Sequence, residues 1–156
     1  MKKIMILIAT FFNIGKFPIA PGTLASFVTT IIVFLFNYTF NPNPIVMVFA
    51  TLIVFFGGII PAKITEDYYN EKDPHLIVID EVSGQMTALL FIPAILSIKG
   101  ISVYILGFFI FRFFDIIKPP PVKQADMIKG GFGIMFDDIL AGLYTLGLLH
   151  LILTIL

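Results

Sequence analysis

Residues 24–40, LASFVTTIIVFLFNYTF, run for seventeen positions without a charged side chain. As a helix, such a stretch rises about 25 Å, close to the thickness of the hydrocarbon core of a bilayer. Further apolar runs of helical length cover residues 45–62, 82–98, 101–111 and 139–156, and none alternates with the period of two expected of a half-buried strand. The pattern predicts an all-α, polytopic membrane bundle of about five apolar helices.

A shorter apolar run, residues 4–12, follows Lys2 and Lys3. Nine helical residues reach only about half of a bilayer core, so we expect a short N-terminal helix that is amphipathic or re-entrant. The chain shows no internal repeat and no linker. We therefore expect residues 1–156 to form a single membrane domain.

The composition supports this class and excludes others. The chain is 58% hydrophobic and 13% charged, whereas soluble domains carry about 25% charged residues. The formal net charge is zero, so no basic field indicates nucleic acid as a partner. The absence of cysteine excludes thiolate nucleophiles and Cys-ligated metals. Composition leaves the oligomeric state open.

The charged residues are unevenly placed along the chain. Sixteen of the twenty lie in two windows, residues 63–81 and 112–138. If the apolar runs cross the membrane in turn, nine of the ten basic residues share one side and only Lys99 lies opposite. The positive-inside rule makes the shared side cytoplasmic. It gathers three polar segments, residues 13–26, 63–81 and 112–138, which favours a single active site there.

Two segments each place adjacent carboxylates at the start of an apolar run. They are residues 73–84 (DPHLIVIDEVSG), with Asp80 and Glu81, and residues 130–142 (GGFGIMFDDILAG), with Asp137 and Asp138. Helix capping explains one acid of such a pair better than two, because adjacent helical side chains diverge by about 100°. Uncompensated carboxylates at a membrane are costly. We therefore predict that these four acids hold Mg²⁺, which prefers oxygen ligands and often binds substrate phosphate as well.

Two other segments carry candidate phosphate ligands. In residues 13–26 (NIGKFPIAPGTLAS), Thr23 or Ser26 either caps the following helix or donates to a phosphate at its N-terminus. In residues 111–121 (FRFFDIIKPPP), Arg112 either pairs with Asp115 three residues on or grips a phosphate with its planar fork. Lys118 precedes a proline, which favours a position beyond the helix as a second cation.

Together the four segments resemble the phosphatidylglycerophosphatase A family. The family motifs have the form P-x-A-P-G-T-x-x-S, D-P-x-x-I-V-x-D-E-x-x-G, F-R-x-F-D-I-x-K-P-x-P and G-G-x-G-I-M-x-D-D-x-x-A-G. The chain carries all four in this order between Pro18 and Gly142, which is most of its length. Each motif alone is modest evidence, whereas four in register are specific.

The resemblance implies a Mg²⁺-dependent lipid phosphatase. Such an enzyme hydrolyses phosphatidylglycerophosphate, a membrane phospholipid, to phosphatidylglycerol and phosphate at the cytoplasmic face of a bacterial inner membrane. It implies a catalytic set of Asp80, Glu81, Asp115, Asp137 and Asp138, of which all but Asp115 are metal ligands. It implies a phosphate-binding set of Thr23, Ser26, Arg112 and Lys118.

The residues leave several alternatives open. The nucleophile is either a water activated by the metal or an Asp carboxylate, and Asp115 either orients Arg112 or joins the metal ligands. The role of His75 is also open. Two other classes remain: a transporter or channel that uses the acids as an ion path, and a catalytically silent helical relative.

The expected topology makes a direct prediction. Single cysteines introduced at Lys72 and Lys123 should both react with a membrane-impermeant maleimide from the cytoplasmic side, because their segments share that side. A cysteine at Lys99 should react only from the opposite side and serves as the control. Labelling of positions 72 and 123 from opposite sides would rule out a shared site.

Overall fold

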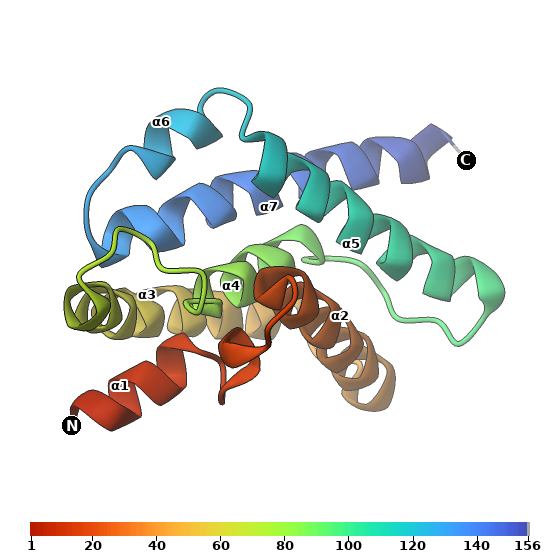
Figure 1. Cartoon of the computed structure of the whole chain (residues 1–156). Coiled ribbons are helices and arrows are strands. Elements are labelled where there is room, and N and C mark those ends of the chain that lie inside the picture. The colour runs from red at the N-terminus through yellow and green to blue at the C-terminus, as the bar shows by residue number, and fades with distance from the viewer. Residues whose placement is uncertain (156) are drawn as a thin grey trace.

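The computed structural model describes residues 1–155, and in this part of the chain all regular secondary structure is helical, with no strand (Figure 1). The elements are α1 (Lys2–Ala9), the 3₁₀ turn η1 (Ile14–Lys16), α2 (Pro21–Phe40), α3 (Pro44–Tyr69), α4 (Ile79–Ala88), α5 (Ile98–Ile117), α6 (Val122–Asp126) and α7 (Gly131–Ile155). The predicted all-α class and the short N-terminal helix are confirmed.

Four helices, α2, α3, α5 and α7, are long and apolar enough to cross a membrane. They contain 20 to 26 residues and therefore rise about 30 to 39 Å. Pro21 and Pro44 begin α2 and α3, where their fixed φ suits the first turn and no amide hydrogen bond is lost. The structure thus confirms a polytopic membrane bundle.

The apolar run at residues 82–98 was predicted as one crossing helix, and this extent is wrong. α4 ends at Ala88, and residues 89–97 are not helical. Phe91 has a left-handed φ of 62°, and Pro93 lacks the amide that a continuing helix needs. α4 packs against α2, α3, α5 and α7, so its apolar residues are buried in protein. The apolar character of the run comes mainly from the non-helical residues after α4, since α4 itself carries Ser83, Gln85 and Thr87.

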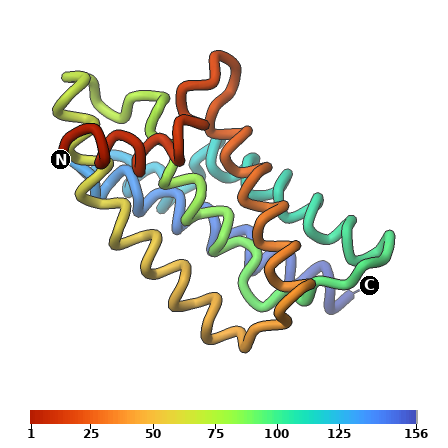
Figure 2. Tube along the Cα trace, turned by 90° about the horizontal axis from the view of Figure 1, so that it is seen from below, coloured from red at the N-terminus to blue at the C-terminus, as the bar shows by residue number. Residues whose placement is uncertain are grey.

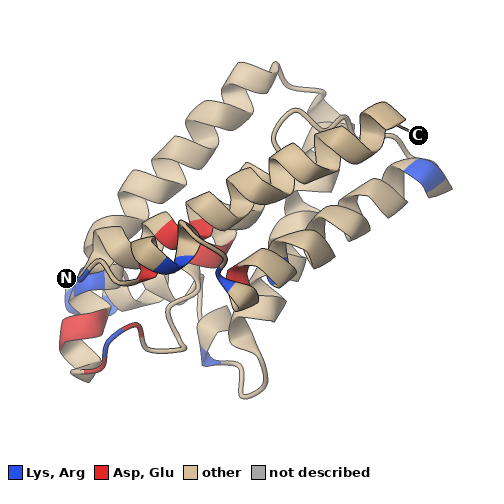
Figure 3. Cartoon of the chain, turned by 90° about the horizontal axis from the view of Figure 1, so that it is seen from above, with Lys and Arg blue, Asp and Glu red and all other residues tan. Residues whose placement is uncertain are grey.

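The helices place the three polar segments at one end of the bundle. The N-terminus and the loops after α3 and α5 lie there, while residues 41–43 and 89–97 lie at the opposite end (Figures 1 and 2). The acidic residues gather toward the same end (Figure 3). Lys72 Nζ donates a hydrogen bond of 3.0 Å to the Asp126 carbonyl, which joins the two charged windows directly. The predicted convergence of these segments is confirmed.

Two glycines allow α4 and α7 to cross in backbone contact. A Cβ added to Gly142 of α7 would collide with the Gly84 carbonyl of α4. A Cβ on Gly84 would lie 2.7 Å from both the Asp138 carbonyl and the Phe111 ring. Close crossings at small residues are typical of helices in membranes. The crossing lies about one helical turn after the acidic residues: Gly84 follows Asp80 and Glu81 on α4, and Gly142 follows Asp138 on α7.

Replacing Gly142 by alanine should therefore destabilise the protein by about 1–3 kcal/mol, because the collision is with backbone that cannot rotate away. Gly147 is the matched control: it lies in the same helix, and a Cβ there meets nothing within 4 Å. Thermal unfolding in detergent measures both variants. Equal stability of Gly142→Ala and Gly147→Ala would show that the crossing has room for a side chain.

Candidate active site

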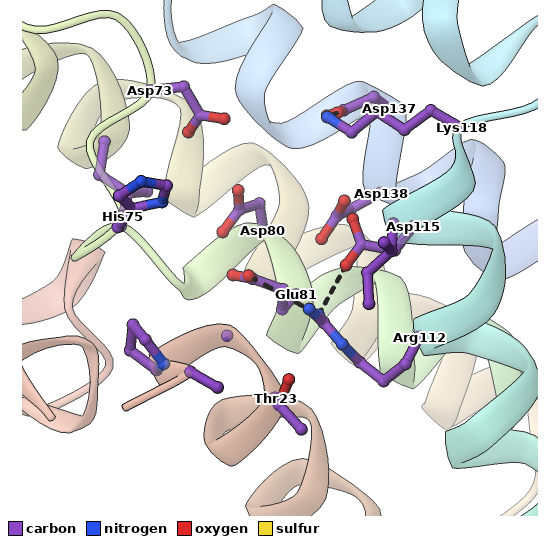
Figure 4. A pocket seen from close by; sticks show the side chains of 15 residues that line it. Thr23, Asp73, His75, Asp80, Glu81, Arg112, Asp115, Lys118, Asp137 and Asp138 are labelled. Carbon is purple, nitrogen blue, oxygen red and sulfur yellow. Dashed lines mark hydrogen bonds and ion pairs between the residues drawn. The ribbon is translucent and has the colours of Figure 1, made fainter. Parts of the chain in front are cut away.

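A pocket of about 320 Å³ lies at the polar end of the bundle (Figure 4). Its lining comes from the start of α2, the loop before α4, the start of α4, the end of α5 and the start of α7. The polar and charged lining residues are Thr23, Asp73, His75, Asp80, Glu81, Arg112, Asp115, Lys118, Asp137 and Asp138. The structure therefore brings together every sequence-predicted site residue except Ser26.

Three carboxylates form the centre of the pocket. One oxygen from each of Asp80, Glu81 and Asp138 lies within 4.8 Å of the others. Asp80 is 7% exposed and Asp138 is 3% exposed. Each of the three also has a buried oxygen without a hydrogen-bond partner among the described residues. Burial, with the charges of Glu81 and Asp138, raises the pKa of Asp80 above its usual value, and burial raises the pKa of Glu81 to about 7.

This donor set fits a divalent cation. Oxygen ligands from two helices, with unpartnered lone pairs in a shielded site, are what a hard cation such as Mg²⁺ requires. A cation there would compensate the buried negative charge, which the neighbouring basic residues do only in part. The acidic cluster can thus hold a metal ion.

Asp137, the fourth predicted metal ligand, lies outside this cluster. Its Oδ2 accepts a hydrogen bond of 2.6 Å from Lys118 Nζ, while Asp126 Oδ1 accepts another of 2.5 Å from the same ammonium. Burial lowers the pKa of Lys118, but these two hydrogen bonds outweigh it and raise the pKa above its usual value. Asp126, on α6, was not predicted, because nothing in its local sequence marks it as a partner for Lys118.

Arg112 and Lys118 lie on opposite sides of the cluster (Figure 4). Arg112 contacts Glu81 of α4 and Ser26 of α2. Its Nη1 is 2.6 Å from Asp115 Oδ2 and 3.7 Å from Glu81 Oε1. The same Nη1 donates to Ser26 Oγ at 3.3 Å, and Ser26 in turn donates to the Gly22 carbonyl at 2.9 Å. The ion pair with Asp115 is present, and the guanidinium also lines the pocket. Ser26 lies behind Arg112, whereas Thr23 lines the pocket.

Gly22 leaves space for Glu81. A Cβ at this position would collide with Glu81 Oε1 and would lie 3.5 Å from Arg112 Nη1. The preceding Ala20 takes a left-handed φ of 47° and Pro21 begins α2, so the turn presents the glycine to α4. The proline–glycine–threonine sequence thus lets α2 start against the acidic cluster.

Two pocket residues had no role assigned from the sequence. Asp73 is partly buried, and its burial raises the pKa of its carboxyl above the usual value. His75 is exposed on the loop between α3 and α4. Both belong to the second motif segment, but residues 71–78 form neither a helix nor a strand. Only the path of this loop places them at the pocket.

Buried carboxylates that can hold a metal, a guanidinium beside them and four spanning helices define a membrane enzyme that acts on an anionic group. The comparisons name its family. The phosphatidylglycerophosphatase A family model matches residues 7–153. The chain belongs to the phosphatidylglycerophosphatase A family, which confirms the predicted lipid phosphatase function in a membrane setting.

Individual relatives agree over most of their length. A phosphatidylglycerophosphatase A of Haemophilus influenzae is 37% identical, over 88% of this chain and 82% of the relative. The Escherichia coli protein of that name is 33% identical, over 94% and 81%. A Bacteroides thetaiotaomicron protein, provisionally named a phosphatidylinositol-3-phosphatase, is 36% identical, over 90% and 87%. No solved structure matches the chain significantly.

The role of Gly22 can be tested by Gly22→Ala. The added methyl meets the flexible end of Glu81, so we expect the fold to persist while the carboxylate is displaced from the cluster. Activity should fall about tenfold or more, because small misplacements of catalytic groups are costly. Gly57→Ala on α3, where a Cβ meets nothing within 4 Å, is the control. Full activity of a folded Gly22→Ala protein would show that the reaction does not depend on the position of the Glu81 carboxylate.

Proposed function

We propose that the chain hydrolyses phosphatidylglycerophosphate to phosphatidylglycerol and phosphate, with Mg²⁺, at the cytoplasmic face of a bacterial inner membrane. The observation that carries this proposal is the cluster of buried Asp80 and Asp138 with half-buried Glu81, which is incompletely compensated beside Arg112. A phosphate monoester could not approach three carboxylates without a cation between them. The site is therefore suited to bind a metal and a phosphate together.

In this proposal Asp80, Glu81 and Asp138 hold the Mg²⁺. When bound, the ion would neutralise phosphoryl charge and make a water more acidic. The three carboxylates come from two helices whose crossing is fixed by Gly84 and Gly142, so their spacing does not depend on a loop. The nucleophile, a water or an Asp carboxylate, is left open.

The cations beside the cluster would receive the phosphate. Arg112 can offer the guanidinium edge that its contacts with Asp115 and Ser26 leave free, and Asp115 fixes the orientation of that group. Thr23 would donate its hydroxyl from the start of α2, with Ser26 supporting Arg112 from behind. Lys118 supplies a second positive charge, and Asp137 acts in the site by holding Lys118 together with Asp126.

The names of the relatives leave the headgroup to be tested. Two name phosphatidylglycerophosphate chemistry and one names a phosphoinositide, and both substrates are phosphate monoesters on a lipid. Phosphate release should be measured from each lipid in mixed micelles, with Mg²⁺ and with a chelator. We expect release from phosphatidylglycerophosphate only with the metal. Release from the phosphoinositide alone, or equal release with the chelator, would contradict the proposal.

The metal ligands make a separate prediction. Asp138→Asn and Asp80→Asn should each lower phosphate release by about a hundredfold or more, because one anionic metal ligand is lost. Stability should be retained or rise, since each change removes a buried charge. Asp67→Asn is the control, as Asp67 is an exposed acid on α3. Activity against Mg²⁺ concentration, with thermal unfolding alongside, gives the readout. Unchanged Mg²⁺ dependence in both Asn variants would place the metal elsewhere.

A further inference from the structure

Exposed residues from two different parts of the fold line the pocket. One is the loop between α3 and α4, where the exposed His75 forms part of the lining. The other lies between α2 and α5, where Ala20 and Ile116 are both exposed and both line the pocket. Ile116 is 69% exposed and belongs to a spanning helix, so this second rim is apolar. The two rims differ in polarity and in the element that forms them.

The second rim continues into an apolar seam between α2 and α5. Phe27 of α2 and Phe108 of α5 contact edge to face, with ring centroids 5.9 Å apart. Arg112 reaches Ser26 one turn nearer the pocket and closes the seam there. The lining residues that the start of α2 supplies are Ala20, Pro21, Gly22 and Thr23, none of which has a large side chain. Phe27 is 49% exposed, which leaves the outer face of the seam open to lipid.

We propose that the lipid substrate enters the pocket sideways from the bilayer, between Ala20 and Ile116. Its glycerol and acyl part rests against Ile116 and Phe27 outside the bundle, while its phosphate reaches Arg112 and the acidic cluster. Water and released phosphate exchange through the rim at His75. This inference rests on the proposed function, because it assumes that the phosphate belongs to a membrane lipid.

The physical reason is the tether between the phosphate and the acyl chains. Withdrawing acyl chains from the hydrocarbon region is costly, so the chains stay in the bilayer. A headgroup that enters from the aqueous side must then bend back over the rim of the pocket. A side opening at the level of a spanning helix lets the phosphate enter while the chains stay in lipid. The polar rim cannot serve the lipid in this way, because it is formed by a loop that carries Asp73 and His75.

Ile116 and Ile117 provide a matched pair of positions for the test. They are adjacent, identical in type and similarly exposed, at 69% and 57%, but only Ile116 lines the pocket. The chain contains no cysteine, so Ile116→Cys and Ile117→Cys each create a single labelling site. Each variant is reacted with a bulky maleimide. Turnover is then measured on phosphatidylglycerophosphate and on p-nitrophenyl phosphate, a water-soluble monoester without acyl chains.

The ratio of lipid to soluble-ester turnover is the decisive quantity. Label at position 116 should lower this ratio about tenfold or more, because it blocks the part of the substrate remote from the reaction. Label at position 117 should leave the ratio within about twofold, since that side chain lies outside the pocket. An unchanged ratio at 116, or equal falls at 116 and 117, would overturn the proposal.

A second measurement is independent of turnover. A benzophenone maleimide at position 116, irradiated in vesicles that contain fluorescent phosphatidylglycerophosphate, should capture that lipid, and excess unlabelled phosphatidylglycerophosphate should suppress the capture. The same probe at position 117 should capture bulk lipid without this competition. Absence of competition at 116 would overturn side entry. Failure of the unmodified protein to hydrolyse any lipid monoester would instead overturn the proposed function.

Discussion

The backbone contact between α4 and α7 is the constraint on which the site depends. Without side chains at Gly84 and Gly142, the two helices approach until carbonyl groups limit them, and this contact fixes the helices that carry the acidic cluster. The cluster destabilises the fold, because its three carboxylates repel one another and lose hydration, two of them being buried. The helices must therefore be held together by packing elsewhere. The fully buried residues Leu89, Leu149 and Met135 supply such packing above and below the crossing.

The charges around the pocket fall into two groups with different roles. Lys118 with Asp126 and Asp137, and Arg112 with Asp115, are pairs at direct ion-pair distances. Within residues 1–155, the one basic residue at ion-pair distance from the acidic cluster is Arg112, 3.7 Å from Glu81, and the cluster keeps unpartnered oxygens. The pocket therefore has a frame of pre-formed ion pairs around an acidic centre whose own charge is not compensated. Such an arrangement binds a cation and an anion better together than either alone, because each offsets the cost of the other.

Much of the fold and of the site could be predicted from the sequence, and the misses have physical causes. Uncharged runs identified the four spanning helices, and the charge distribution gathered the polar segments at one end. Hydropathy over residues 82–98 could not show that the helix ends at Ala88, because the non-helical residues after it, such as Leu89, Phe91 and Ile95, are as apolar as those of a spanning helix. The adjacent acids Asp137 and Asp138 looked equivalent in the chain, but helical geometry turns one toward Lys118 and the other toward the cluster. The positions of Asp126 beside Lys118 and of His75 at the pocket depend on the paths of loops, which the local sequence pattern does not predict.

The short length of α4 has a consequence for how the protein is made. A ten-residue helix cannot anchor itself across a bilayer, yet it contributes two of the three clustered carboxylates. The spanning helices can insert one by one, but α4 has a stable position only after α2, α3, α5 and α7 have assembled around it. The nascent, partly inserted chain therefore lacks the assembled acidic cluster. Under the proposed function, hydrolysis becomes possible only at the last step of assembly, so that activity would report that the bundle is complete.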